Sequence, residues 1–322
     1  MMNVDSNRTQ NLPHWLQPFW YESGNEKDSN NQKMFSSVDR SLNSIREKDD
    51  VDSPVWETSC QTLEELKVLF EKSSGLVFRG QASASWELNS SLVRLMKDCG
   101  VSVDKGAQIQ VASKHLGPFI FGEHVLRKLI HRSQENPGPE QELVFAQHHG
   151  YPTHLLDWTE SLDNALFFAF EDVPVDESGH VAVFAVDVGK IYIHAYCRDQ
   201  ETDPSDVKLD EILKWLKEDG QIFSMSHWTF CRPGGFWDVR MSVQKTVLSA
   251  QIHVDSLEDH LNSKFQLAAL PGTLVKVSMP ALIRTEVMNY LNDEDINRNA
   301  LFPDLDAMCK KAKSKLVNCL LK

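Results

Sequence analysis

Side chains that could do chemistry concentrate between Phe78 and Phe170. The first group is Phe78-Arg79-Gly80-Gln81, which places an arginine at the end of a short apolar run. The following glycine permits close approach of the backbone to a ligand. An arginine in this setting anchors a phosphate or carboxylate, or it forms one half of a structural ion pair. Spacing alone favours the ion pair.

The second group is the run of residues 147–159, with the sequence QHHGYPTHLLDWT. Polar residues of this density around a helix end and a loop are typical of functional sites. Each residue also has an ordinary structural interpretation. Asp157 is suited to bonding loop amides, Thr159 to capping the next helix, and Trp158 to the core. These alternatives stay open.

Metal and nucleotide-triphosphate motifs are missing from the sequence. His148 and His149 would point about 100° apart on a helix, so they are poorly placed to bind one metal ion together. The patterns HExxH, GxSxG, GxxxxGK[ST] and GxGxxG do not occur. The sequence therefore predicts no metal, and it disfavours serine hydrolysis and nucleoside triphosphate cleavage.

The composition of the chain limits the classes of protein to which it can belong. The 322 residues are 41% hydrophobic and 25% charged, which is typical of a globular chain. The formal net charge of −13 disfavours general nucleic-acid binding. No apolar run approaches the roughly 20 residues that span a bilayer. Six scattered cysteines without a CxxC pair favour reduced thiols and a cytoplasmic location.

Residues 1–55 differ from the rest of the chain. Of the 34 residues from Glu22 to Val55, 24 are Ser, Asn or charged, which predicts a flexible leader. An aromatic segment, residues 13–22, interrupts it. Either this segment folds back onto the body, or Trp15, Phe19 and Trp20 dock a protein partner or a second copy of the chain.

The body, residues 56–322, predicts a single mixed α+β domain. Helices are expected mainly in its first half, including 62–70, 91–96, 111–132, 140–149 and 161–170. Strands are expected at 76–78 and mainly in the second half, at 180–188, 246–254 and 273–279, with helices also at 207–217, 281–291 and 304–321. There is no βαβ alternation that would require a doubly wound sheet.

These motifs together resemble the FRG domain family, which is named for its Phe-Arg-Gly motif. The resemblance extends from about Trp56 to Met308, and its most specific part is HHGxPTxLLDWT. Arg240…Gln244 and the closing LFPDLDA also match. The family usually has arginine, glycine and glycine at three positions where this chain has His154, Thr246 and Ala307.

The resemblance implies an ADP-ribosyltransferase-like fold and an activity that consumes NAD as substrate, without a metal. It further implies a bacterial or phage toxin or defence system. In this scheme Arg79 grips the diphosphate or a ribose oxygen, while Thr159 and Gln244 act at the ribose. The surrounding substrate-binding candidates are Phe78, Gly80, His148, His149, His154, Asp157 and Trp158.

Two function classes follow from these observations. The first is an NAD-consuming ADP-ribosyltransferase or NAD glycohydrolase. A carboxylate stabilises an oxocarbenium-like transition state better than the amide of Gln244 does, so Asp157 or Glu160 is an alternative third residue. The second class is a non-enzymatic FRG-type module that recognises a ligand or partner.

Overall fold

The computed structural model describes residues 53–71, 76–100, 144, 147–148, 150–174, 178–208, 210–212, 214–215, 229–231, 239–251, 255–264, 270 and 272–303. The predicted leader, apart from residues 53–55, lies outside these ranges. The predicted helices 111–132 and 304–321 lie outside them as well, and so does most of 140–149.

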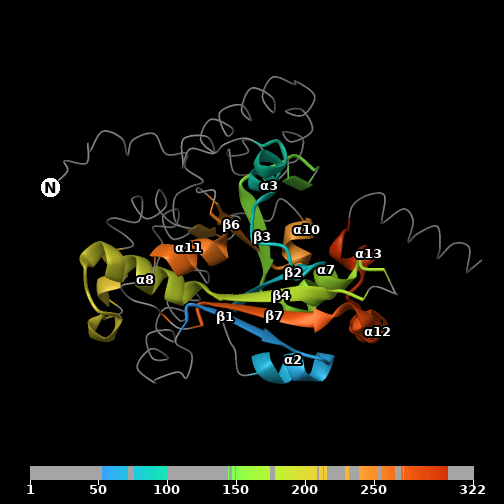
Figure 1. The fold of residues 1–322 in the computed structure, drawn as a ribbon. Coiled ribbons are helices and arrows are strands. Elements are labelled where there is room, and N and C mark those ends of the chain that lie inside the picture. The colour runs from blue at the N-terminus through green and yellow to red at the C-terminus, as the bar shows by residue number, and fades with distance from the viewer. Residues whose placement is uncertain are drawn as a thin grey trace, which may run out of the picture.

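Seven strands form one mixed sheet in the order β1-β7-β4-β2-β3-β6-β5 (Figure 1). β1 runs parallel to β7, whereas all the other neighbouring pairs are antiparallel. This mixed sheet, together with its helices, confirms the predicted α+β class. The strands are β1 (Val55–Ser59), β2 (Leu76–Gln81), β3 (Leu155–Thr159), β4 (His180–Asp187), β5 (Thr229–Cys231), β6 (Thr246–Ala250) and β7 (Leu274–Pro280).

Several helices begin at a side chain that caps the first turn. Thr62, Ser90 and Ser161 each accept a hydrogen bond from the backbone N–H three residues further on. The helices are α2 (Leu63–Phe70), α3 (Ser91–Asp98), α7 (Leu162–Phe170), α8 (Val188–Gln200), α10 (Val239–Val243), α11 (Leu257–Lys264), α12 (Arg284–Asp293) and α13 (Arg298–Leu301). Short 3-10 turns occur at Pro204–Asp206 and Ala281–Ile283.

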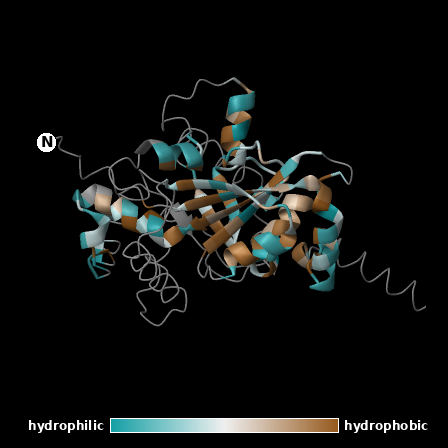
Figure 2. Ribbon diagram, turned by 60° about the horizontal axis from the view of Figure 1, so that its bottom comes forward, coloured by the Kyte–Doolittle hydropathy of each residue, from teal (hydrophilic) through white to brown (hydrophobic). Residues whose placement is uncertain are grey.

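The core lies on both faces of the sheet. Alternate residues of a strand point to opposite faces, and β4 is buried along both of its faces. Val181, Val183 and Ala185 pack in one cluster with α7 and α12, whereas Ala182 and Phe184 pack in the other cluster with α8 and α11. Figure 2 shows apolar residues along the central strands and hydrophilic ones on the outer helices.

Two local differences from the sequence-based expectation concern the second half. Arg240 to Val243 belong to the short helix α10, a helix that the sequence analysis does not predict. The chain then turns through Lys245, which has a φ of 49°, and β6 begins at Thr246. Helix α8 was not predicted. Among the described residues, no helix has the length and apolar character needed to cross a membrane.

Candidate functional site

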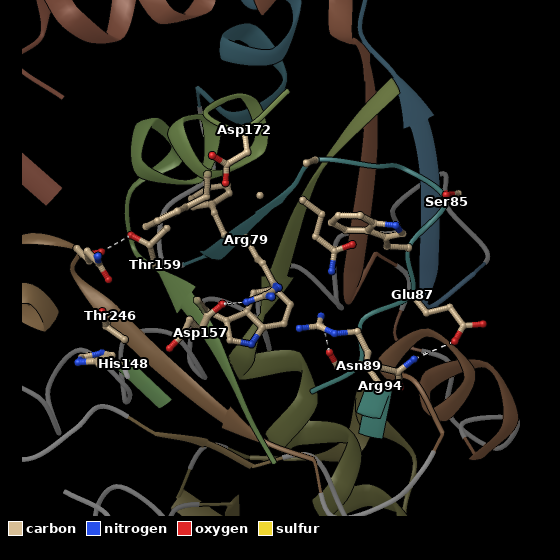
Figure 3. A pocket seen from close by; sticks show the side chains of 18 of the residues that line it. Arg79, Ser85, Glu87, Asn89, Arg94, His148, Asp157, Thr159, Asp172 and Thr246 are labelled. Carbon is tan, nitrogen blue, oxygen red and sulfur yellow. Dashed lines mark hydrogen bonds between the residues drawn. The ribbon is translucent and has the colours of Figure 1, made fainter. Parts of the chain in front are cut away.

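Strands β2 and β3 meet at one point and then diverge. Their only paired residues are Phe78 and Thr159, while β2 continues along β4 and β3 along β6. We call this divergence the β2–β3 fork. Arg79 bridges it, because its Nη1 donates a hydrogen bond to the backbone oxygen of Asp157 at 2.5 Å (Figure 3). The side chain thereby occupies the gap that the strand backbones leave open.

A cavity of about 780 Å³ lies at the fork. Its walls come from β2, the segment that follows it, α3, β3, the end of α7 and the α10–β6 turn. Arg79, Asp157, Thr159 and Gln244 all line it, although they are far apart in sequence. The other lining residues are Phe78, Gly80, Gln81, Ala82, Ser85, Trp86, Glu87, Asn89, Arg94, Lys97, Asp98, His148, Trp158, Phe168, Asp172, Arg240 and Thr246.

The Phe-Arg-Gly sequence positions β2 against α7. Phe78 is buried and packs edge-to-face on Phe70 with 5.3 Å between ring centroids. Gly80 is required by close packing, since a Cβ there would overlap the carbonyl oxygen of Ala165 and lie 2.6 Å from the backbone nitrogen of Ala169. The glycine therefore serves the approach of α7 to the sheet. Arg79, between these two residues, points to the opposite face.

The charge of Arg79 is retained at neutral pH. Burial lowers the pKa of its guanidinium to about 10, the Asp157 carboxylate raises that pKa, and the positive charge of Arg94 lowers it. None of the ion pairs within the described residues includes Arg79. The structural ion pair that spacing favoured is therefore not found among the described residues. The guanidinium instead has one backbone acceptor and a buried Nε that makes no hydrogen bond.

The loop before β3 is held by side-chain hydrogen bonds. Gln147 donates from Nε2 to Oδ2 of Asp157 at 2.7 Å and accepts from the hydroxyl of Thr153. The backbone N–H of Thr153 donates to Oγ of Ser91 at 3.0 Å, and Ser91 Oγ donates to the backbone oxygen of Thr153 at 3.2 Å. These contacts fix Asp157 at the cavity and join the loop to the start of α3.

The comparison with protein families assigns this region. Residues 74–178 match the FRG domain family model. The resemblance inferred from the motifs is thus confirmed for residues 74–178, which we call the FRG region, whereas Arg240…Gln244 and the closing LFPDLDA lie outside the match. The region contains the strands of the fork and α3, together with α7. Neither the curated proteins nor the solved structures contain a significant match to the chain.

Three predicted site residues in or near the FRG region also hold the fold together. The hydroxyl of Thr159 donates to the backbone oxygen of Gln244 at 2.7 Å. Nε2 of Gln244 donates to the backbone oxygen of Leu301 at 2.9 Å, which ties the cavity wall to α13. The indole of Trp158 donates to Oγ of Ser249 at 2.8 Å, and this side chain is buried.

The three histidines that are predicted as site residues have different positions. His148 lines the cavity, whereas His149 lies outside the described residues. His154 is buried at the start of β3 and is not among the cavity residues. Burial lowers the pKa of His154 to about 4, so its imidazole is neutral at pH 7. Among the described residues, no group of three His, Cys, Asp or Glu is arranged to hold a metal ion.

The sequence analysis missed several cavity residues as site residues, among them Gln81, Trp86 and Arg94. Gln81 is only 4% exposed, and neither polar atom of its amide has a hydrogen-bond partner. Trp86 is 53% exposed although it is a large aromatic residue. Arg94 lines the cavity from α3. Strand alternation offered a signal for Gln81, because it lies two residues after Arg79 and so shares its face. Sequence patterns offered none for Trp86.

Proposed function

We propose that the cavity at the β2–β3 fork binds NAD and that the protein consumes it, by ADP-ribosyl transfer or by NAD glycohydrolysis. The FRG resemblance also suggests the setting, which is a bacterial or phage toxin or defence system. One observation carries the proposal: Arg79 lies in the cavity as a cation that forms no salt bridge within the described residues.

The hydrogen-bond donors and the volume of the cavity suit a nucleotide. A guanidinium has five N–H donors, and Arg79 donates one hydrogen bond to the described residues. The remaining donors can bind phosphate oxygens in pairs. The volume of about 780 Å³ lies within the usual range of small-molecule sites. The exposed ring of Trp86 offers a surface on which a base can stack.

A carboxylate is available for the chemical step. Cleavage of the nicotinamide–ribose bond develops positive charge on the ribose, which a carboxylate stabilises. Asp157 lines the cavity, whereas Glu160 does not. Nε2 of Gln244 is already committed to Leu301. The contacts therefore favour Asp157 as the residue that faces the ribose, with Gln244 supporting the wall.

The proposal is tested by incubating the protein with NAD and measuring free nicotinamide, together with calorimetric titration. Arg79→Lys should weaken NAD binding about tenfold or more, nearly as much as Arg79→Ala, because lysine provides a point charge without the planar fork. Arg298→Lys is the matched control, since Arg298 is an exposed arginine outside the cavity. Equal binding by the two lysine variants would contradict the proposed role of Arg79.

A non-enzymatic recognition module is the second candidate, and a separate observation favours it. The polar atoms of Thr159, Gln244 and Trp158 already bond within the protein. A binding site without turnover needs no such groups for chemistry. Asp157→Asn separates the two candidates, because the contacts favour this carboxylate at the ribose. In an NAD-consuming enzyme it should lower turnover beyond any loss of folded protein. Wild-type protein that neither binds NAD nor releases nicotinamide would favour the module.

A further inference from the structure

Three arginines line the cavity, and two of them, Arg79 and Arg94, face each other's elements across it. Arg79 comes from β2 and Arg94 from α3. Figure 3 shows both guanidinium groups projecting into the space between these elements. Their proximity is independently indicated because the charge of Arg94 lowers the pKa of Arg79. The two like charges repel each other, and an anion bound between them would relieve this repulsion.

Four carboxylates border the cavity, those of Glu87, Asp98, Asp157 and Asp172. Oε2 of Glu87 accepts from Nζ of Lys97 and from Nδ2 of Asn89, both at 2.8 Å. Asp157 accepts from Gln147 through its side chain. Two of the acidic groups that border the cavity are thus held by other partners, although the chain as a whole has an excess of acids.

Arg94 itself keeps most of its donors available. Its Nη1 donates to the backbone oxygen of Asn89 at 3.2 Å. No ion pair within the described residues includes Arg94. The side chain is exposed toward solvent at the cavity, unlike the half-buried Arg79. The two guanidinium forks therefore approach the same space from different walls, one from within the sheet and one from the rim.

From this geometry we propose that Arg79 and Arg94 form a two-arginine clamp for a diphosphate. Each fork binds oxygens of one phosphate group, and a diphosphate provides two such groups in succession. A monophosphate or a carboxylate occupies only one fork. The clamp adds detail to the proposed function and rests on it, because the proposed function identifies the cavity as the ligand-binding site. It assigns the ligand class as a nucleoside diphosphate or a dinucleotide.

The clamp is tested with ADP and AMP as probes in calorimetric titration. Wild-type protein should bind ADP at least tenfold tighter than AMP. Arg94→Ala should weaken ADP binding about tenfold and AMP binding much less, so the preference collapses. Arg94→Lys should restore only part of it, because an ammonium does not bind two oxygens in one plane. Lys208→Ala is the charge-matched control, since Lys208 is exposed and lies outside the cavity.

Measurements of folding and turnover distinguish failure of the clamp from failure of the proposed function. Arg94 is exposed and has few contacts, so the melting temperature of Arg94→Ala should stay near that of wild type. Equal affinity of wild type for ADP and AMP, no ADP binding, or an unchanged ADP affinity in Arg94→Ala would overturn the clamp. Nicotinamide release with an unaltered KM in Arg94→Ala would overturn it while leaving the proposed function intact. If ADP binding depends on Arg94 but no nicotinamide is released, the clamp is supported and the proposed consumption of NAD is refuted.

Discussion

The two faces of β2 meet different demands. On one face Phe78 packs on Phe70, and Gly80 leaves just enough space for the backbone of α7. On the other face Arg79 has no ion pair within the described residues, and the buried amide of Gln81 has no hydrogen-bond partner. The first face is closely packed, whereas the second carries polar groups whose hydrogen-bonding capacity is only partly used. Tight packing on the first face fixes the strand, so the second can hold polar groups ready for a ligand.

The packed face should show the largest effect of a single substitution. Gly80→Ala places a methyl group against the backbone of Ala165 and Ala169, which cannot move aside as a flexible side chain can. We expect a loss of about 3 kcal/mol in the free energy of unfolding, at the upper end of the usual cost of overpacking. Urea denaturation of the purified variant measures it.

Gly150→Ala is the control for Gly80→Ala. Gly150 has a φ of 83°, and a Cβ there would meet no atom within 4 Å. The cost should therefore be only that of left-handed backbone, about 1 kcal/mol. Equal losses in the two variants would show that the close approach of α7 does not explain the glycine of the motif.

Much of the local structure could be predicted from the sequence. The alternating run from His180 predicts β4, and Ser161 predicts the start of α7. Helix α8 was missed because its β-branched and aromatic residues favour a strand, while Asp187, whose side chain accepts from the N–H of Lys190, caps it. Pattern arguments describe which residues share a face of one element. They do not identify which strands become neighbours.

The candidate site, too, could be predicted only in part, because sequence patterns do not show which residues become neighbours. Arg79 and Asp157 stood out by residue type and motif, yet their contact across the fork joins positions 78 residues apart. Arg94 is hidden in an amphipathic helix, where an arginine on a polar face is ordinary. Trp86 is noticeable only through its exposure beside the cavity. Such residues become site candidates only in the folded structure, which shows that they line the same cavity.

The other arm of the fork carries a buried titratable group, which should give a pH-dependent stability. The folded-state pKa of His154 is about 4, below its ordinary value of 6.5, because burial disfavours the imidazolium. Between these values the unfolded chain binds a proton that the folded chain does not. Stability from this group is therefore complete above about pH 6.5 and falls as the pH drops toward 4, by up to about 3 kcal/mol.

Urea denaturation at several pH values between 7.5 and 4.5 measures this loss. Because carboxyl groups also titrate in this range, the decisive quantity is the difference between wild type and His154→Gln. We expect the variant to lose less stability than wild type as the pH falls. Parallel pH profiles for the two proteins would refute the buried neutral histidine.

A smaller effect is expected where the fork closes. The hydroxyl of Thr159 donates to Gln244 and accepts from the backbone N–H of Ser161 at 3.1 Å. Thr159→Val keeps the shape of the side chain and removes both bonds, so the free energy of unfolding should fall by about 1–2 kcal/mol. Thr246→Val is the control, because no hydrogen bond of the Thr246 side chain is seen in the described residues, and it should change stability by less than about 0.5 kcal/mol. A loss of nicotinamide release in folded Thr159→Val would add a role at the ribose to the structural one.

The smallest expected change has the opposite sign. Gln81→Leu replaces a buried amide that has no partner with an apolar group of similar size. Stability should therefore rise by about 1 kcal/mol, because the folded protein no longer carries an unsatisfied amide. Gln251 provides a matched contrast, since its buried amide accepts from the backbone of Ser90 at 2.6 Å and donates to Asn89 at 3.0 Å. Gln251→Leu should destabilise the protein by leaving these partners unpaired.

If the amide of Gln81 is kept for a ligand, the stabilised Gln81→Leu variant should also bind ADP less tightly than wild type. A Gln81→Leu variant that is destabilised like Gln251→Leu would show that the cavity face of β2 is as fully satisfied as the packed one.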